Sequence, residues 1–129
     1  MSFFSWFKKA SQKSKKQDTN FPNVVVGQIT AIDAHPNASR LQLATVNVGK
    51  NLKIVCGAPN IAVGQYVPVA MIGACLANGM AIQQASIRGV DSEGMICAED
   101  ELGIGNDHSG VIVFEKACVG DPIDEYIKK

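Results

Sequence analysis

Short stretches of alternating apolar and polar residues, separated by turn-forming residues, constrain this chain more than any other feature. From Val24 onward there are about six of them, beginning with Val24–Asp33, Leu41–Val48 and Leu52–Cys56. The later turns include Asn78-Gly79, a pair typical of two-residue β-hairpins. Many short strands with glycine-rich turns and little helix are typical of small β-barrels. We therefore predict an all-β fold whose architecture is a five-stranded antiparallel Greek-key barrel.

The second strand of this series has an irregular apolar pattern. Leu41 and Leu43 share one parity, whereas the apolar residues from Ala44 onward share the other. A β-bulge between Leu43 and Ala44 would account for this change of phase. For the rest of the chain we expect strands at Tyr66–Met71, Ala81–Ile87 and Val111–Phe114, one helical turn at Ala98–Leu102 capped by Gly103, and a short tail helix at Asp124–Lys129.

Residues 1–20 differ in composition from everything that follows. Phe3, Phe4, Trp6 and Phe7 precede a run of lysines, and the segment carries a net charge of +4. On a helix, the aromatic and lysine side chains would occupy opposite sides. We therefore predict a basic N-terminal arm, either an amphipathic helix or a disordered tail. Residues 21–23 are expected to form a linker, and residues 24–129 a single domain.

The overall charge disfavours a protein that binds nucleic acid through bulk charge alone. Twelve basic and twelve acidic residues give a formal net charge of zero. Any basic surface must therefore be local. No apolar run approaches the roughly 18 residues that a membrane span needs, so we expect no stable membrane insertion.

Cysteine usage bears on metal binding and on the cellular compartment. Cys56, Cys75, Cys97 and Cys118 lie about 20 residues apart, without the CxxC spacing of zinc sites. Each lies in an apolar or small-residue run, so we predict buried free thiols in a reducing, cytoplasmic environment. The phosphate-binding glycine loop, HExxH and GxSxG motifs are also missing from the sequence. We expect no cofactor, no metal and no enzymatic activity.

Five ordered segments carry a resemblance to a known family. They read HPNA at 35–38, IVCGAPN at 54–60, RGVDSEGMIC at 88–97, ELGI at 101–104 and DHSG at 107–110. Together they resemble the tRNA-binding OB-fold domain found near the N-terminus of bacterial phenylalanyl-tRNA synthetase β subunits and in free-standing YtpR-type proteins. The resemblance runs from Val24 to about Ile123. It implies an OB-fold barrel with short C-terminal additions and a role in binding RNA.

Five residues are candidates for RNA contacts: Arg40, Lys53, Asn60, Arg88 and Ser92. The guanidinium of Arg88 suits phosphate recognition, although an intramolecular pair with a nearby acid would also explain it. Asn60 follows a tight loop, and it either holds that loop or contacts a base or ribose. Ser92 either donates to a phosphate or caps its local turn.

Two other features qualify this list. His35-Pro36 ends the first long strand, where a histidine either supports the barrel corner or contacts RNA directly. Gln83 and Gln84 lie where synthetase-like members of the family usually carry lysines. These glutamines keep hydrogen-bonding capacity but provide no charge.

The expected function is a non-catalytic module that binds tRNA or another structured RNA, either free-standing or beside an aminoacyl-tRNA synthetase. If Arg40, Lys50, Lys53 and Arg88 all reach phosphates, the log–log salt slope would be about −3. Such binding is weak, so a homodimer or the basic arm would have to assist. The alternatives are a structural or assembly domain of a phenylalanyl-tRNA synthetase β-like subunit, and a CsaA-like chaperone.

Overall fold

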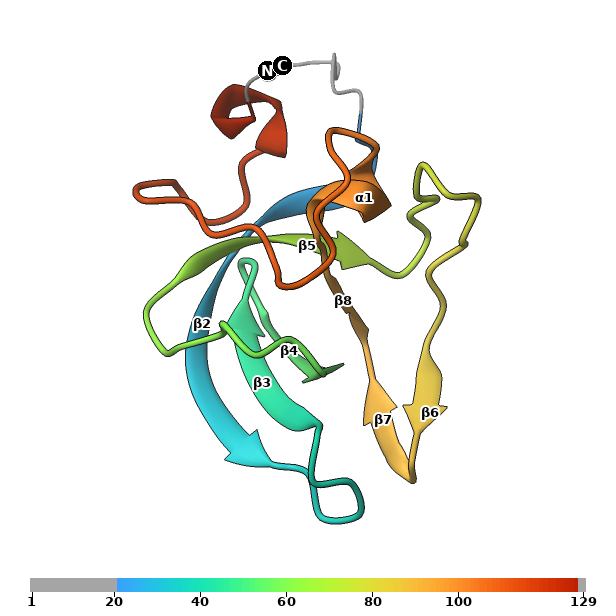
Figure 1. Ribbon diagram of the computed structural model, residues 1–129. Helices are drawn as coiled ribbons and strands as arrows, with labels where there is room; N and C mark the ends of the chain where they lie inside the picture. The colour runs from blue at the N-terminus through green and yellow to red at the C-terminus, as the bar shows by residue number, and fades with distance from the viewer. Residues whose placement is uncertain (1–20, 128–129) are drawn as a thin grey trace, which may run out of the picture.

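Short antiparallel strands make up most of the fold (Figure 1). The computed structural model describes residues 21–127. Its elements are β2 (Val24–Ala34), β3 (Gln42–Asn47), β4 (Asn51–Cys56), β5 (Tyr66–Met71), β6 (Ala85–Ile87), β7 (Val90–Ser92), β8 (Gly94–Ile96), the helical turn α1 (Glu99–Leu102) and the 3-10 helix η2 (Ile123–Tyr126).

Five of the strands form one sheet that curls into a barrel. Their order is β4-β3-β2-β5-β8, and every neighbouring pair is antiparallel. The two outer strands are joined just before β8, where the Glu93 N–H donates to the Lys53 carbonyl oxygen at 2.9 Å. The prediction of an all-β, five-stranded antiparallel OB barrel is confirmed. Strands β6 and β7 form a separate hairpin that projects from the barrel.

The sheet contains a β-bulge, but it lies in β2 and not in the strand where we predicted one. Strand β3 pairs with β4 without interruption, and the register shift lies in β2 between Ile29 and Ala31. The prediction for Leu41–Val48 was therefore wrong. Leu43 lies opposite Val55 on the outer face of the sheet, and both residues are half-buried. The apolar pattern changes phase because Leu43 packs against Val55 on the outer face, whereas the backbone of β3 remains regular.

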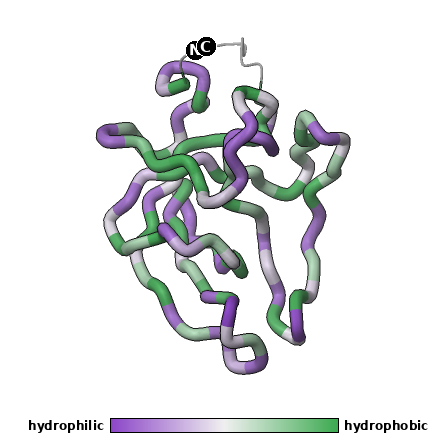
Figure 2. Tube along the Cα trace, viewed as in Figure 1, coloured by the Kyte–Doolittle hydropathy of each residue, from purple (hydrophilic) through white to green (hydrophobic). Residues whose placement is uncertain are grey.

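The core lies inside the barrel and under its C-terminal segment. Two clusters of buried apolar residues fill it, one around Ile29 and Ile54 and the other around Val26 and Ile123. Gly27 is needed for close packing here, because a Cβ atom would lie 2.7 Å from Val46 Cγ1. Figure 2 shows hydrophobic residues concentrated along β5 and hydrophilic residues along α1.

The remaining strand predictions were partly wrong. The expected strand at Val111–Phe114 is reduced to one bridge between Phe114 and Tyr66, and only Ala85–Ile87 of the expected strand at 81–87 is regular. These segments make isolated backbone hydrogen bonds, such as Ile112 N–H to the Cys97 carbonyl oxygen, and form no continuous ladder. Periodicity does not distinguish the two arrangements. The helical turn before Gly103 is confirmed, with Gly103 in the left-handed region at φ 74°.

The ends of the chain bear on the remaining predictions. The expected tail helix is a 3-10 turn that begins at Ile123, one residue earlier than predicted. Phe21 packs against the core cluster that contains Ile123. The prediction of an arm at residues 1–20 lies outside the described residues. Within 21–127, no helix has the length and apolarity that crossing a bilayer requires.

Candidate nucleic-acid interface

The loop between β2 and β3 and the tip of the β6–β7 hairpin meet at one end of the barrel. We call this region the hairpin end; it comprises residues 35–41 and 85–92, at the bottom of Figure 1, together with the outer faces of β3 and β4. We call the opposite region, α1 together with residues 103–127, the helix end.

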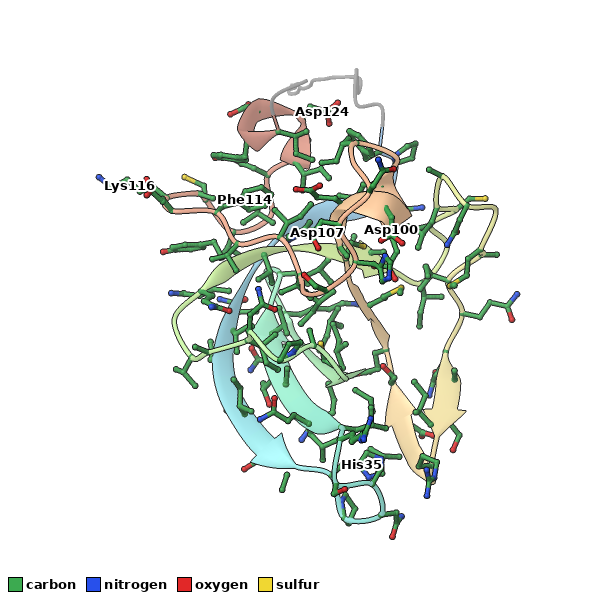
Figure 3. The ribbon with its side chains drawn as sticks, viewed as in Figure 1. His35, Asp100, Asp107, Phe114, Lys116 and Asp124 are labelled. Atoms are coloured by element: carbon green, nitrogen blue, oxygen red, sulfur yellow. The ribbon has the colours of Figure 1, made fainter. Side chains whose placement is uncertain are left out.

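His35 fastens the two parts of the hairpin end together. Its side chain is buried, at 6% exposure, and is labelled at the bottom of Figure 3. Its Nδ1 accepts a hydrogen bond from the Asn37 N–H at 2.9 Å, so Nε2 carries the proton and donates to the Ile87 carbonyl oxygen at 3.0 Å. Both ring nitrogens are therefore used inside the protein, which confirms the structural reading of His35.

Arg88 occupies the tip of the hairpin in an unusual backbone conformation. Its φ is 53° and that of Gly89 is 90°, as in the two-residue turns with two left-handed positions that favour Asn-Gly. Asn37 braces the turn: its Nδ2 donates to the Arg88 carbonyl oxygen at 2.9 Å, and Arg88 Nη2 donates to the Asn37 carbonyl oxygen at 3.3 Å. No ion pair between Arg88 and a carboxylate occurs within residues 21–127. The guanidinium therefore keeps donors that face solvent.

The outer faces of β3 and β4 form a continuous surface next to these loops. Thr45 lies opposite Lys53, and Lys53 is the only charged residue on the two strands. In OB-fold barrels this face and the adjoining loops bind oligonucleotides. Arg40 lies in the same loop as His35, in a turn closed by the Leu41 N–H donating to the Ala38 carbonyl oxygen. The structure thus places Arg40 and Arg88 in loops at one end of this face, and Lys53 within the face itself.

The other two predicted contacts have internal partners. Asn60 Nδ2 donates to the Val111 carbonyl oxygen, and its Oδ1 accepts from the Val111 N–H, both at 3.0 Å. Ser92 is 3% exposed; its Oγ accepts from the Val55 N–H at 3.0 Å and donates to the Gly94 carbonyl oxygen at 3.1 Å. Asn60 thus fixes the chain at Val111, and Ser92 joins β4 to β7. RNA contacts by these two residues stay predictions, and the geometry favours their structural readings.

The helix end is strongly acidic. Residues 21–127 carry five basic and eleven acidic side chains, a net charge of −6, and eight of the acids lie at the helix end. Figure 3 labels Asp100, Asp107 and Asp124 there. Hydrogen bonds from the Ser109 hydroxyl and N–H lower the pKa of Asp107 below its usual value. A phosphate backbone would meet like charge on this side.

A hollow of about 260 Å³ lies between the two ends, and several segments of the sequence motifs line it. Its walls come from residues 55–59, from Met95, Ile96 and Ala98, and from residues 108–111, with Glu101 at the side. Glu101 Oε1 accepts from the Ala98 N–H at 2.7 Å. Burial and the Glu101 carboxylate raise the pKa of Cys97 to about 12, and burial raises that of Cys56. The motif residues here bond mainly to one another.

The cysteine prediction was wrong in one respect. All four cysteines are free, but only Cys56 and Cys97 are buried, whereas Cys75 and Cys118 are exposed. The small residues around the exposed pair mark turns, where apolar neighbours do not imply burial. No group of three or more potential metal ligands occurs within the part of the chain that the structure describes.

Comparison with known families decides the assignment. The family model described as "Putative tRNA binding domain" matches residues 24–121. The chain belongs to this family.

Members of the tRNA binding domain family occur as parts of larger proteins. The chain is 47% identical over 112 residues to the phenylalanine–tRNA ligase beta subunit of Chlorobaculum tepidum, and 54% identical over 96 residues to that of Syntrophus aciditrophicus. These matches cover 81% and 74% of this chain but only 14% and 12% of the relatives. The chain therefore corresponds to a small part of each of those subunits.

Solved structures share the fold at low identity. The C-terminal domain of Plasmodium vivax p43 matches with a TM-score of 0.55 and 23% identity, covering 81% of this chain and 59% of that chain. A MetRS-related protein from Pyrococcus horikoshii matches with a TM-score of 0.53 and 18% identity, covering 78% of this chain and 87% of that chain. Both similarities confirm the barrel.

Sequence reasoning missed two residues that organise this tRNA binding domain. Asn37 braces the Arg88 turn, and Glu93 Oε1 accepts from the Lys53 N–H at 2.8 Å while its own N–H joins β4. Both lie inside the motifs HPNA and RGVDSEGMIC. Their position in motifs was visible in the sequence, but their partners are 40 or more residues away.

Proposed function

We propose that this chain is a non-catalytic module that binds tRNA or another structured RNA through its hairpin end. Membership of the tRNA binding domain family supports RNA as the ligand. The observation that carries the proposal is the position of Arg40, Lys53 and Arg88 around the face that OB barrels use for oligonucleotides. All three are exposed.

The residues around this face determine how RNA is bound. Asp91 lies at the hairpin end, and Asp33 and Glu93 directly adjoin it in the sequence, so these three acids balance the charge of Arg40, Lys53 and Arg88. Individual contacts must therefore attract the RNA, since the surface as a whole does not. Phosphate contacts by three cations give weak affinity, with a log–log salt slope of roughly −2 to −3. Residues 1–20 carry +4 and are proposed to add long-range attraction.

The module is proposed to act in the cytoplasm, either alone or beside an aminoacyl-tRNA synthetase. The relatives named above are ligase subunits of which this chain matches a small part. The four free cysteines fit a reducing compartment. A homodimer, which would double the number of contacts, stays a prediction.

Binding to total tRNA at about 50 and 200 mM salt tests the proposal, and a matched pair of variants makes the test specific. Lys53→Ala removes a cation from the hairpin end, and Lys116→Ala removes one from the helix end (Figure 3). We expect Lys53→Ala to weaken binding and to reduce the salt slope by about one unit. Lys116→Ala should leave the slope unchanged. Equal effects of the two variants would contradict the assigned face.

Arg88 needs a substitution that keeps its turn. Glycine adopts a φ of 53° without strain, so Arg88→Gly removes the guanidinium while preserving the hairpin. We expect a loss of affinity at least as large as that of Lys53→Ala, with thermal stability retained. Unchanged affinity of a folded Arg88→Gly protein would assign Arg88 a purely structural role.

One observation favours a second function, as a structural or assembly domain of a synthetase β-like subunit. The net charge of −6 on residues 21–127 repels nucleic acid at long range. If the full chain binds no tRNA even at about 50 mM salt, the RNA-binding proposal fails and the assembly function replaces it.

A further inference from the structure

A second hollow lies at the hairpin end, between β4 and the segment that leads into β6. It has a volume of about 420 Å³. Its lining includes Val55, Met80, Ile82, Gln84, Ile87 and Met95. In Figure 1 the chain after β5 moves away from the barrel and returns as β6 beside β7. We call this hollow the hairpin groove. It shares Val55 and Met95 with the 260 Å³ hollow that Glu101 lines.

The hairpin groove is free of charge. The sequence contains no Asp, Glu, Lys, Arg or His from Ile54 through Ile87. Ile82 is buried, whereas Met80 is 45% exposed, so the groove offers an accessible apolar surface. A phosphate or a charged side chain would lose its hydration here without gaining a partner. The groove therefore fits an uncharged, largely apolar group.

Polar groups at the edge of the groove have unused hydrogen-bonding capacity. Gln83 and Gln84 are exposed and line it. Neither side chain has a hydrogen-bond partner among residues 21–127. Each amide offers both donors and an acceptor, as the edge of a nucleobase does. The edge is thus chemically complementary to a flat ring that carries donors and acceptors.

Cations lie on both sides of this neutral region. Lys53 shares the outer face of β4 with Val55, and Arg88 directly follows Ile87. A ligand that fits this pattern is neutral in the middle and anionic on both sides. An unpaired nucleotide within an RNA strand has this character, and single-stranded bases are the usual targets of sequence-reading RNA modules.

We infer that the hairpin groove holds the base of an unpaired nucleotide, while its flanking phosphates reach Lys53 and Arg88. This inference rests on the proposed RNA-binding function and adds a residue-level site to it. No aromatic side chain is among the described residues that line the groove. The base is therefore held by aliphatic and methionine contacts and by the glutamine amides, without ring stacking.

Filling the groove tests this inference without changing charge. Ala85 lines the groove and is exposed, so Ala85→Leu adds bulk where the base would lie. Ser86 is exposed on the same strand but does not line the groove, so Ser86→Leu is the matched control. We expect Ala85→Leu to weaken tRNA binding by about tenfold with an unchanged salt slope, because no phosphate contact is lost. Ser86→Leu should bind like the parent chain.

A chemical probe separates a base from a backbone effect. A short single-stranded RNA should bind the full chain about tenfold more tightly than an abasic strand of equal length and charge, because only the base buries apolar surface in the groove. Ala85→Leu should remove this difference. If abasic and normal strands bind equally, the inference is wrong.

The remaining outcomes distinguish this inference from the function on which it rests. If Lys53→Ala weakens tRNA binding but Ala85→Leu does not, RNA binding stands and the groove assignment is overturned. If no variant or parent protein binds tRNA, both fail. If sedimentation shows self-association that Ala85→Leu abolishes while base dependence is absent, the groove is a protein-docking surface instead.

Discussion

The two ends of the barrel use their polar side chains differently. At the helix end, polar groups bond to one another: Glu101 to the Ala98 N–H, and Asp107 to Ser109. At the hairpin end, His35 and Asn37 hold the loops together, whereas the charged groups of Arg88 and Lys53 face solvent. The helix end is negatively charged and several of its carboxylates have internal partners, whereas the hairpin end keeps free donors.

This difference shows what the family motifs contribute. The side chains of several motif residues, such as Asn60 and Ser92, form hydrogen bonds within the protein. They position the loops and do not offer free groups to a ligand. A chain with a net charge of −6 in its described part is therefore compatible with RNA binding, provided that the acids lie away from the contact face.

The largest expected effect concerns Ser92, which joins β4 to β7. Ser92→Ala removes the acceptor of the Val55 N–H and the donor to the Gly94 carbonyl oxygen. Because Ser92 is buried and its partners lose these bonds, we expect a loss of about 2 kcal/mol in the free energy of unfolding, measured with urea. Ser86→Ala, at an exposed serine, should change stability by less than about 0.5 kcal/mol.

The same variant tests the structural reading of the motif. Folded Ser92→Ala should bind tRNA like the parent chain, since its hydroxyl already has internal partners. A variant of unchanged stability that binds tRNA more weakly would place Ser92 in the interface.

A second prediction concerns alkaline pH and the buried thiol of Cys97. Burial and Glu101 raise the pKa of Cys97 from 9.0 to about 12. The folded protein therefore retains a proton that the unfolded chain releases. This contribution is complete below pH 9 and is lost as the pH rises toward 12, by up to about 1.4 kcal/mol per pH unit. Urea midpoints at about pH 8 and 10 measure the loss.

The Cys97→Ala variant is the control for this effect. The substitution removes the titrating thiol, so the decline in stability between about pH 8 and 10 should become shallower than in the parent chain. Part of the decline remains, because burial also raises the pKa of Cys56. An equally steep decline in Cys97→Ala would exclude Cys97 as its source.

The sequence predicted the barrel and the helical turn at Ala98–Leu102 because both have local signals, namely alternation and a glycine cap. It also indicated Arg40, Lys53 and Arg88 as RNA contacts, although their placement on and around one face depends on tertiary structure. It did not predict where polar side chains find partners. The Asn60–Val111 and Asn37–Arg88 bonds each join residues 51 positions apart. Pattern reasoning carries no information on such pairs.

A third prediction addresses residues 1–20, whose charge of +4 contrasts with the acidic described part. Deleting them should leave the barrel folded and lower tRNA affinity by about tenfold at 50 mM salt, with a smaller loss at 200 mM. Binding isotherms of both proteins at the two salt concentrations provide the measurement. Equal affinities at low salt would contradict an electrostatic contribution from this segment.

The smallest expected effect compares one charge change at the two ends. Asp91 lies in the hairpin near Arg88, whereas Asp100 lies in α1 at the helix end. Asp91→Asn and Asp100→Asn each remove one negative charge and alter the side chain in the same way. At 0.1 M salt, repulsion between exposed charges is largely screened beyond about 10 Å. If RNA lies on the hairpin end, Asp91→Asn should strengthen tRNA binding by about twofold, and Asp100→Asn should change it less.

Titrations of both variants against the same tRNA at about 0.1 M salt measure the difference. A larger gain from Asp100→Asn would move the RNA to the helix end and reverse the roles assigned to the two regions.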